Sequence, residues 1–463
     1  MTIQTNSNVL VALRKEVTAG VTATVTSAFQ VRIIGSPGLT LQRAPITSAE
    51  LRADGSETMG RLGGKSVDGS FDTELTAGGA IDYLVEGLMR SAWVTSTSVA
   101  FSSLTSLAIG TNNVTATAGD WVGTQGIRVG DVFKLSTGVS ANADLNKVVI
   151  AVTSLTITTT PASFTVAAAT STGTLTVLKK VKSAATPTRR SHTIEQYDED
   201  TDLTELFVGC RVVGFKLSAK PNEEVKCSWM FKGMDRFALA SGASPYFTSP
   251  ALTTGISMIA DDASVLYNGA LVTTFTGIDL DFTIAADAQS VLGSFVSPDI
   301  FDNILSVKGT ITGLRSDFSN LTLYDAETEF AVNVLFQELA SAPKPCFNVF
   351  LPRVKISALS APVGGQTGPK IETLELMVGT KVAATGSDGT IATFSSSVII
   401  DGYVGRTQAH LRAVRRFVLD SALPLPLAYW GNLDAGVCSG RGESFLQGAH
   451  TRHDKENQYP QGQ

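Results

Sequence analysis

One short stretch alternates so regularly between apolar and polar residues that it constrains the fold of the whole chain. The segment Lys65–Leu75 places apolar side chains on one side: Val67, Phe71 and Leu75. The other side carries mainly carboxylates: Asp68, Asp72 and Glu74. Because successive side chains of a strand point to opposite faces, this pattern predicts a β-strand with one buried face and one acidic face.

The next stretch, residues 80–93, has the spacing of an amphipathic helix. Its apolar residues recur at i, i+3, i+4, i+7 and i+11: Ile81, Leu84, Val85, Leu88 and Ala92. This spacing places them in one stripe along a helix. The sequence therefore predicts a helix that packs on the apolar face of the strand carrying Phe71.

Composition narrows the class of protein. The chain has 463 residues, enough for two or three domains, and its 42 glycines together with many Thr, Ser and Val residues favour β-structure. The net charge of −6 argues against a general nucleic-acid-binding surface. The sequence has no run of 18 apolar residues and no charged-then-apolar N-terminus, so we expect neither a membrane span nor a signal peptide.

The amino-acid composition changes between residues 96 and 185. This segment is nearly all Thr, Ser, Val, Ala and Gly, with short strand-like runs at hairpin spacing. The two-sided pattern of the first segment resumes afterwards. We therefore expect 96–185 to be a separable inserted β-domain, interrupting a parent domain made of residues 1–95 and 186–250.

The second half of the sequence repeats the first. Ser306–Ile311 is similar to Ser66–Phe71, and Phe350–Ala358 is similar to the strand around Phe215. This order predicts a second copy of the parent domain over residues 251–395. Residues 396–463 form a C-terminal extension of unclear nature, in which Thr407–Leu423 has the composition of a basic helix.

Three motifs suggest chemistry at first sight, and each departs from the pattern that the chemistry needs. Gly60–Ser66 ends like a phosphate-binding loop, but its first glycine is replaced by Met59 and a strand follows instead of a helix. Asp198, Asp200 and Asp202 have calcium-loop spacing without the later Gly and Glu. His192 is the one histidine before residue 400, and the four cysteines lack metal-site spacing. We predict no catalytic residue, no metal and no cofactor.

Several segments, taken in order, resemble a known family. They are Ile46–Arg52, Gly64–Asp72, the helix that follows, Phe207–Phe215 and Leu351–Lys355. Together they resemble the tail tube protein, or major tail protein, of long-tailed, non-contractile bacteriophages (siphophages), over most of residues 10–395. The resemblance implies a mostly β fold with two tandem tail-tube-like antiparallel β-sandwich or barrel domains, each with a short helix, plus the inserted β-domain.

The resemblance also implies a function. The protein would be a structural, non-enzymatic virion component that stacks as rings into the tail tube, the conduit for DNA ejection. It would be assembled in the host cytoplasm. Two copies per chain favour a trimer forming a pseudo-hexameric ring, with a hexamer as the second choice. The implied partners are the tape measure protein, the tail terminator and distal tail proteins, and DNA that passes without specific binding; no membrane is involved.

Site residues follow from the same resemblance. The acidic strand face would line the lumen, with candidates Asp68, Asp72 and Glu74. The charged segment between Arg43 and Gly64 would be a long loop that contacts the next ring, with candidates Arg43, Glu50, Arg52, Glu57 and Arg61. One alternative is a multi-domain β adhesin or carbohydrate-binding virion protein. Another is a polysaccharide hydrolase using paired carboxylates.

Overall fold

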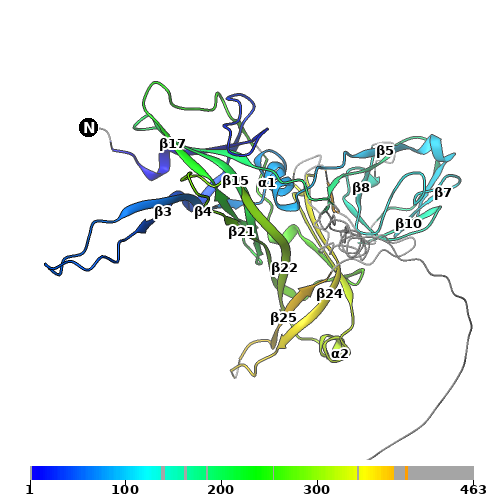
Figure 1. The fold of residues 1–463 in the computed structure, drawn as a ribbon. Coiled ribbons are helices and arrows are strands. Elements are labelled where there is room, and N and C mark those ends of the chain that lie inside the picture. The colour runs from blue at the N-terminus through cyan, green and yellow to red at the C-terminus, as the bar shows by residue number, and fades with distance from the viewer. Residues whose placement is uncertain are drawn as a thin grey trace, which may run out of the picture. The chain divides into compact units, whose positions relative to one another are not determined.

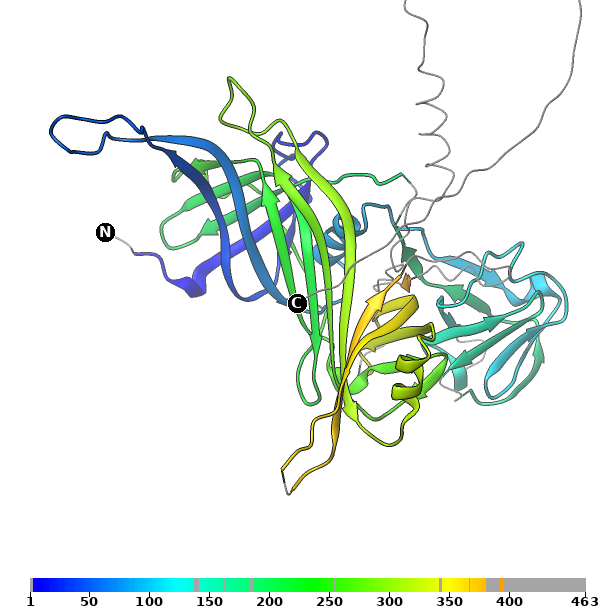
Figure 2. The ribbon, with the colours of Figure 1, turned by 60° about the horizontal axis from the view of Figure 1, so that its bottom comes forward.

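The computed structural model describes residues 3–136, 141–160, 164–183, 186–253, 255–340, 344–365, 367–379 and 392–394. Its core is a large sheet of 16 strands, built almost entirely from antiparallel pairs (Figures 1 and 2). A second sheet of eight strands is formed by the inserted segment. The prediction of a mostly β fold with short helices is confirmed. The predicted extension 396–463, with its basic helix, lies outside the described residues.

The first half of the large sheet is built from segments on both sides of the insert. Its elements are β1 (Val9–Lys15), β2 (Phe29–Val31), β3 (Ile33–Ile46), β4 (Arg61–Glu74), α1 (Ala80–Met89), β14 (His192–Asp198), β15 (Leu203–Ala219), β16 (Lys226–Gly233) and β17 (Asp235–Leu239). The strands pair in the order β2-β1-β14-β15-β16-β4-β3, and β17 pairs with the first part of β15. A short strand, β18 (Ala251–Leu252), pairs with β2.

The second half repeats this order. Its elements are β19 (Ser264–Tyr267), β20 (Ala270–Val272), β21 (Phe275–Ala288), β22 (Ile300–Leu314), α2 (Ser319–Asp325), β23 (Phe330–Gln337), β24 (Cys346–Ser360) and β25 (Ile371–Val378). The strands pair in the order β20-β19-β23-β24-β25-β22-β21. Each strand therefore has a counterpart in the first half, and each half has one helix between its second long strand and the strand that follows.

The irregularities of the two halves also coincide. A bulge between Val212 and Gly214 in the β15–β16 ladder has its counterpart between Ile356 and Ala358 in the β24–β25 ladder. A second register shift, at the start of β14, recurs at the start of β23. A bulge is set by local residue placement, so shared bulges allow the two halves to be matched residue by residue.

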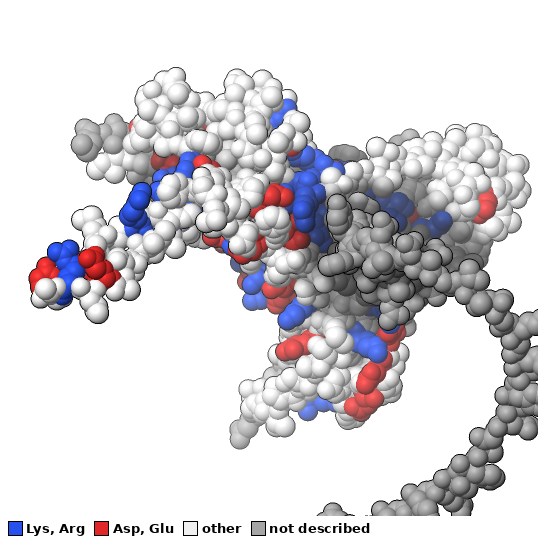
Figure 3. All heavy atoms as spheres, in the orientation of Figure 1, with Lys and Arg blue, Asp and Glu red and all other residues white. Residues whose placement is uncertain are grey.

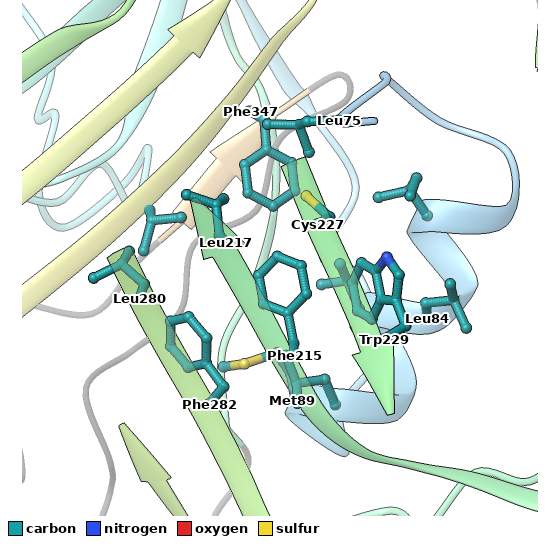
Figure 4. Close-up of a cluster of buried hydrophobic side chains, with 14 of the residues drawn as sticks. Leu75, Leu84, Met89, Phe215, Leu217, Cys227, Trp229, Leu280, Phe282 and Phe347 are labelled. Carbon is teal, nitrogen blue, oxygen red and sulfur yellow. The ribbon is translucent and has the colours of Figure 1, made fainter. Parts of the chain in front are cut away.

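A continuous hydrophobic core runs through both halves, and Figure 4 shows the part around α1, β15 and β16. Phe71 and Leu75 from β4 and its end are buried, and Leu84 on α1 lies in the same cluster as Trp229 on β16. The indole Nε1 of Trp229 donates a hydrogen bond of 3.2 Å to Thr73 Oγ1, which satisfies the buried polar groups of both side chains. The predicted packing of the helix on the sheet that carries Phe71 is confirmed.

The glycine-rich segment before β4 is not the long loop that we predicted from Arg43 to Gly64. Strands β3 and β4 both extend into it, and only residues 47–60 connect them. The backbones approach closely here, because a Cβ atom on Gly63 would lie 2.9 Å from the carbonyl oxygen of Ala44. The glycines therefore serve a tight ladder rather than a turn, and Arg43 and Arg61 lie on strands.

The inserted segment folds as a sheet with its own core. Its strands are β5 (Thr97–Ala100), β6 (Leu107–Ile109), β7 (Asn113–Ala116), β8 (Val132–Leu135), β9 (Lys147–Val152), β10 (Thr156–Thr160), β11 (Ala167–Thr170) and β12 (Thr174–Val177). Trp121, Phe101 and Phe133 are fully buried in this core. A short strand, β13 (Lys179–Val181), follows and pairs with β26 (Ala392–Phe394).

The insert is not a free appendage, because it also contacts the second half. Val132, Val148 and Leu178 are buried in the core shared by the two halves. The Nζ of Lys134 donates to the carbonyl oxygen of Lys344 at 2.8 Å, and Phe350 packs with Val129. Excision of the insert would expose this apolar surface, and the separability that we expected from composition stays a prediction.

Replacing Leu84 with Ala tests the helix–sheet core. Leu84 is 1% exposed, so its truncation should lower the free energy of unfolding by about 2–5 kcal/mol. Leu51 is 99% exposed, and the matched Leu51→Ala variant should change that free energy by less than about 0.5 kcal/mol. Urea unfolding of unassembled protein provides the measurement; equal losses for the two variants would contradict the proposed packing.

Candidate assembly surface

The predicted lumen residues lie on the face of the large sheet that points away from the core. Asp68, Asp72 and Glu74 alternate along β4 with the buried residues Val67, Phe71 and Thr73. Asp72 is opposite Ser228 in the ladder with β16 and makes no ion pair with the described residues. The three carboxylates therefore share one polar surface.

Lysines on neighbouring strands share this surface. Lys232 on β16 is opposite Asp68, and its Nζ lies 3.4 Å from a carboxylate oxygen of that residue. Further along, Lys216 on β15 lies 3.6 Å from Asp281 on β21. The face is thus less acidic than β4 alone indicates. Sequence reasoning missed these lysines because it identified the strands without knowing which residues stand opposite one another.

Glu74 differs from the other two carboxylates in its surroundings. Its pKa is raised, mainly by a hydrogen bond with Glu224 and also by partial burial. A guanidinium nitrogen of Arg32 lies 3.8 Å from the same carboxylate and favours its charged form. Glu74 is therefore held in a local network of side chains at the end of the strand. Asp72 has no such network among the described residues.

One strand pairing joins the two halves of the large sheet. The second part of β15 pairs with β21, with Phe215 opposite Phe282 and Lys216 opposite Asp281. The rings of Phe215 and Phe282 stack with centroids 5.7 Å apart. The corresponding part of β24, which begins at Ala358, has no such neighbour within the described residues, since it pairs with β25 alone.

The matching free edge lies at the other end of the same sheet. Strand β3 is the counterpart of β21, and in the described part of the chain it pairs with β4 alone. One molecule thus presents an unpaired edge of β24 and an unpaired edge of β3, which correspond to the two strands joined inside the chain. Unpaired edges are templates for further strand pairing.

The hairpin of β3 and β4 projects from the sheet and ends in a charged tip (Figures 1 and 3). Three of the predicted inter-ring residues lie in the connecting segment 47–60: Glu50, Arg52 and Glu57. Arg52 pairs with Asp54 at 3.3 Å, so part of the tip charge is satisfied within the hairpin. Apolar side chains are exposed beside these charges: Ile46, Leu51, Met59 and Leu62.

The described residues hold no group of three or more metal-binding side chains. Asp200 instead accepts hydrogen bonds from Thr5 and Asn8, and Asp202 accepts one from Ser241. His192 is fully buried, and burial lowers its pKa to about 4, so the imidazole is neutral at physiological pH. No helix in the described part of the chain is long and apolar enough to cross a membrane.

Comparison with known proteins identifies the family. A search of curated proteins finds no match to this chain. A family model described as phage tail tube protein matches residues 6–395, which is most of the sequence and includes both halves and the insert. The chain therefore belongs to the phage tail tube protein family, whose members have a structural role in the tail.

Proposed function

We propose that three copies of this chain close into a ring of six tube folds, and that such rings stack into the hollow tail tube of a siphophage. The observation that carries the proposal is the duplicated sheet with one internal junction and two corresponding open edges. If β24 of one chain pairs with β3 of the next, every junction in the ring has the same architecture. A closed ring leaves no open edge within it.

The internal junction predicts the register between chains. Lys216 is opposite Asp281 inside the chain, and the shared bulges make Ser360 and Thr40 their counterparts. Ser360 on one chain should therefore stand opposite Thr40 on the next. Both side chains are exposed in the single chain, which leaves them available for this contact.

Disulfide trapping tests this register and counts the chains. The double variant Ser360→Cys/Thr40→Cys should, after mild oxidation, give covalent products of two and three chains and none larger. The matched control Ser360→Cys/Leu41→Cys should give little product, because neighbouring side chains on β3 point to opposite faces. Products of four to six chains, or a mass of six chains in isolated rings, would contradict the trimer.

We also propose that the polar face bearing Asp68, Asp72 and Glu74 lines the lumen. Its charge would vary around the ring, since the counterparts of Asp68 and Asp72 in the second half are Lys308 and Thr312. Carboxylates repel the phosphate backbone, and Lys216 and Lys232 each lie beside a carboxylate that offsets their attraction for it. DNA would then pass through the tube without being held.

Replacing Asp72 with Lys tests the lumen. The change replaces a negative charge with a positive one, a shift of two units per chain, at a position without an ion pair among the described residues, so DNA ejection from particles carrying Asp72→Lys should slow. The effect should be largest at low ionic strength, because the distance over which charges interact falls to about 10 Å at 0.1 M salt. Asp72→Asn is the matched control and should have a smaller effect. Ejection can be followed by dye fluorescence; equal rates for all three proteins would exclude Asp72 from the lumen.

The tip of the β3–β4 hairpin is proposed to contact the next ring. It carries Glu50, Arg52 and Glu57 in an exposed segment, and mixed charges suit a polar docking contact. The strand residues Arg43 and Arg61 would support the hairpin rather than form its tip. The other proposed partners are the tape measure protein inside the tube and the terminator and distal tail proteins at its ends. Assembly would take place in the host cytoplasm, with no cofactor and no catalysis.

Shortening the tip separates ring formation from stacking. Replacing residues 48–57 with a short Gly-Ser turn leaves β3, β4 and the sheet edges intact. The variant should therefore form rings of normal mass but few or no tubes in electron micrographs. Normal tubes from this variant would show that the tip has no part in stacking.

A further inference from the structure

The junction inside the chain is held by a partly buried cluster of charges as well as by strand pairing. Three arginines from the first half form what we call the basic corner: Arg90, Arg189 and Arg211. They receive Asp299 and Asp302, which lie where the β21–β22 connection enters β22. The Nη1 atoms of Arg90 and Arg211 lie 3.2 and 3.3 Å from Asp302, whose side chain is 6% exposed.

The second half has a different set of charges at the corresponding place. The start of β23 matches the start of β14. Glu327, the left-handed residue two positions after α2, matches the left-handed Arg90 at the end of α1. The shared register makes Lys355 the counterpart of Arg211. We call Glu327, Glu329, Arg353 and Lys355 the mixed corner.

The mixed corner is already neutralised within its own half. Both guanidinium contacts of Arg353 with Glu329 are 2.6 Å long. Lys355 lies 3.6 Å from Glu327 and 3.9 Å from Glu329. Both of its cations are therefore engaged by carboxylates of the same half. The Glu327 side chain is 83% exposed.

The hairpin that would reach this corner from a neighbouring chain is also different. In the register shared by β3–β4 and β21–β22, Leu62 corresponds to Asp302, and three residues earlier Met59 corresponds to Asp299. Met59 and Leu62 are 93% and 55% exposed in the single chain. The end of the β3–β4 connection and the start of β4 therefore present apolar side chains where the second hairpin presents carboxylates.

We propose that the mixed corner is the docking site for Met59 and Leu62 of a neighbouring copy of this chain, and that the two corners together force the halves to alternate around the ring. The proposal rests on the ring described above. If the β21–β22 hairpin were placed on a mixed corner, Asp299 and Asp302 would lie against Glu327 and Glu329. The β3–β4 hairpin placed on a basic corner would leave three arginines without their carboxylates, which is costly for Arg90 and Arg211 because both are largely buried. Both mispaired junctions are disfavoured, which is how specificity between similar surfaces is obtained.

Exchange of charge between corner and hairpin tests the contact. Glu327→Lys/Glu329→Lys gives the mixed corner the polarity of the basic corner, and Met59→Asp/Leu62→Asp gives the first hairpin the carboxylates of the second. Each pair of substitutions alone should lower the yield of rings by about tenfold or more, equivalent to about 1.4 kcal/mol. The four substitutions together should restore ring yield to within about threefold of the natural chain. Yield is measured as the fraction of protein in rings by sedimentation.

Two controls make the result decisive. Asp262→Lys/Asp325→Lys changes the net charge as much as the corner variant does and should leave ring yield unchanged. The hairpin variant alters two side chains that are exposed in the single chain, so it serves if the corner variant folds poorly, as judged by its thermal melt. Two results would overturn the docking site alone. One is three-chain rings that form equally well in every variant. The other is a ring yield of the four-substitution variant that is no higher than the yields of the two double variants. Failure of the natural chain to form three-chain rings would overturn the ring and the docking site together.

Discussion

The pairing of β15 with β21 is the interaction on which the rest of the molecule depends. It joins two halves that each carry their own complete strand order, and it turns them into one continuous sheet. Phe215 lies at its centre, with ring centroids 4.2 Å from Trp229 on one side and 5.7 Å from Phe282 on the other. The backbone ladder itself is independent of side-chain identity, so the same junction can be repeated between chains wherever the flanking residues permit it.

Two halves with the same strand order need not be identical, and the structure shows where they differ. The first half accommodates the insert in the connection between α1 and β14, while the second half spans the same connection, from α2 to β23, with four residues, 326–329. Arg90 and Arg189 flank the insertion. An insertion at this point leaves every ladder of the parent sheet intact. The insert leaves the first half and packs on the second half. The two halves therefore differ in their contacts with the insert.

This asymmetry has a physical consequence for assembly. Two identical halves would offer two indistinguishable junctions, and the order of halves around a ring would be set by the covalent link alone. Here one junction buries arginines against carboxylates, while the corresponding surface of the other half is neutralised by its own side chains. A difference in desolvated charge discriminates between similar surfaces more strongly than a difference in apolar shape.

Sequence by itself determined the local features of this protein. The alternation along Lys65–Leu75 and the stripe that contains Leu84 predicted a strand and a helix that pack together, because side-chain periodicity reports burial directly. The order of motifs also indicated the duplication. Tertiary structure alone decided which residues meet: Lys232 opposite Asp68, the insert on the second half, and Asp302 among three arginines. It also showed that glycines near Gly63 belong to a ladder and not to a loop. Such contacts depend on the register between segments far apart in the chain, which bulges and core packing set and which no local pattern records.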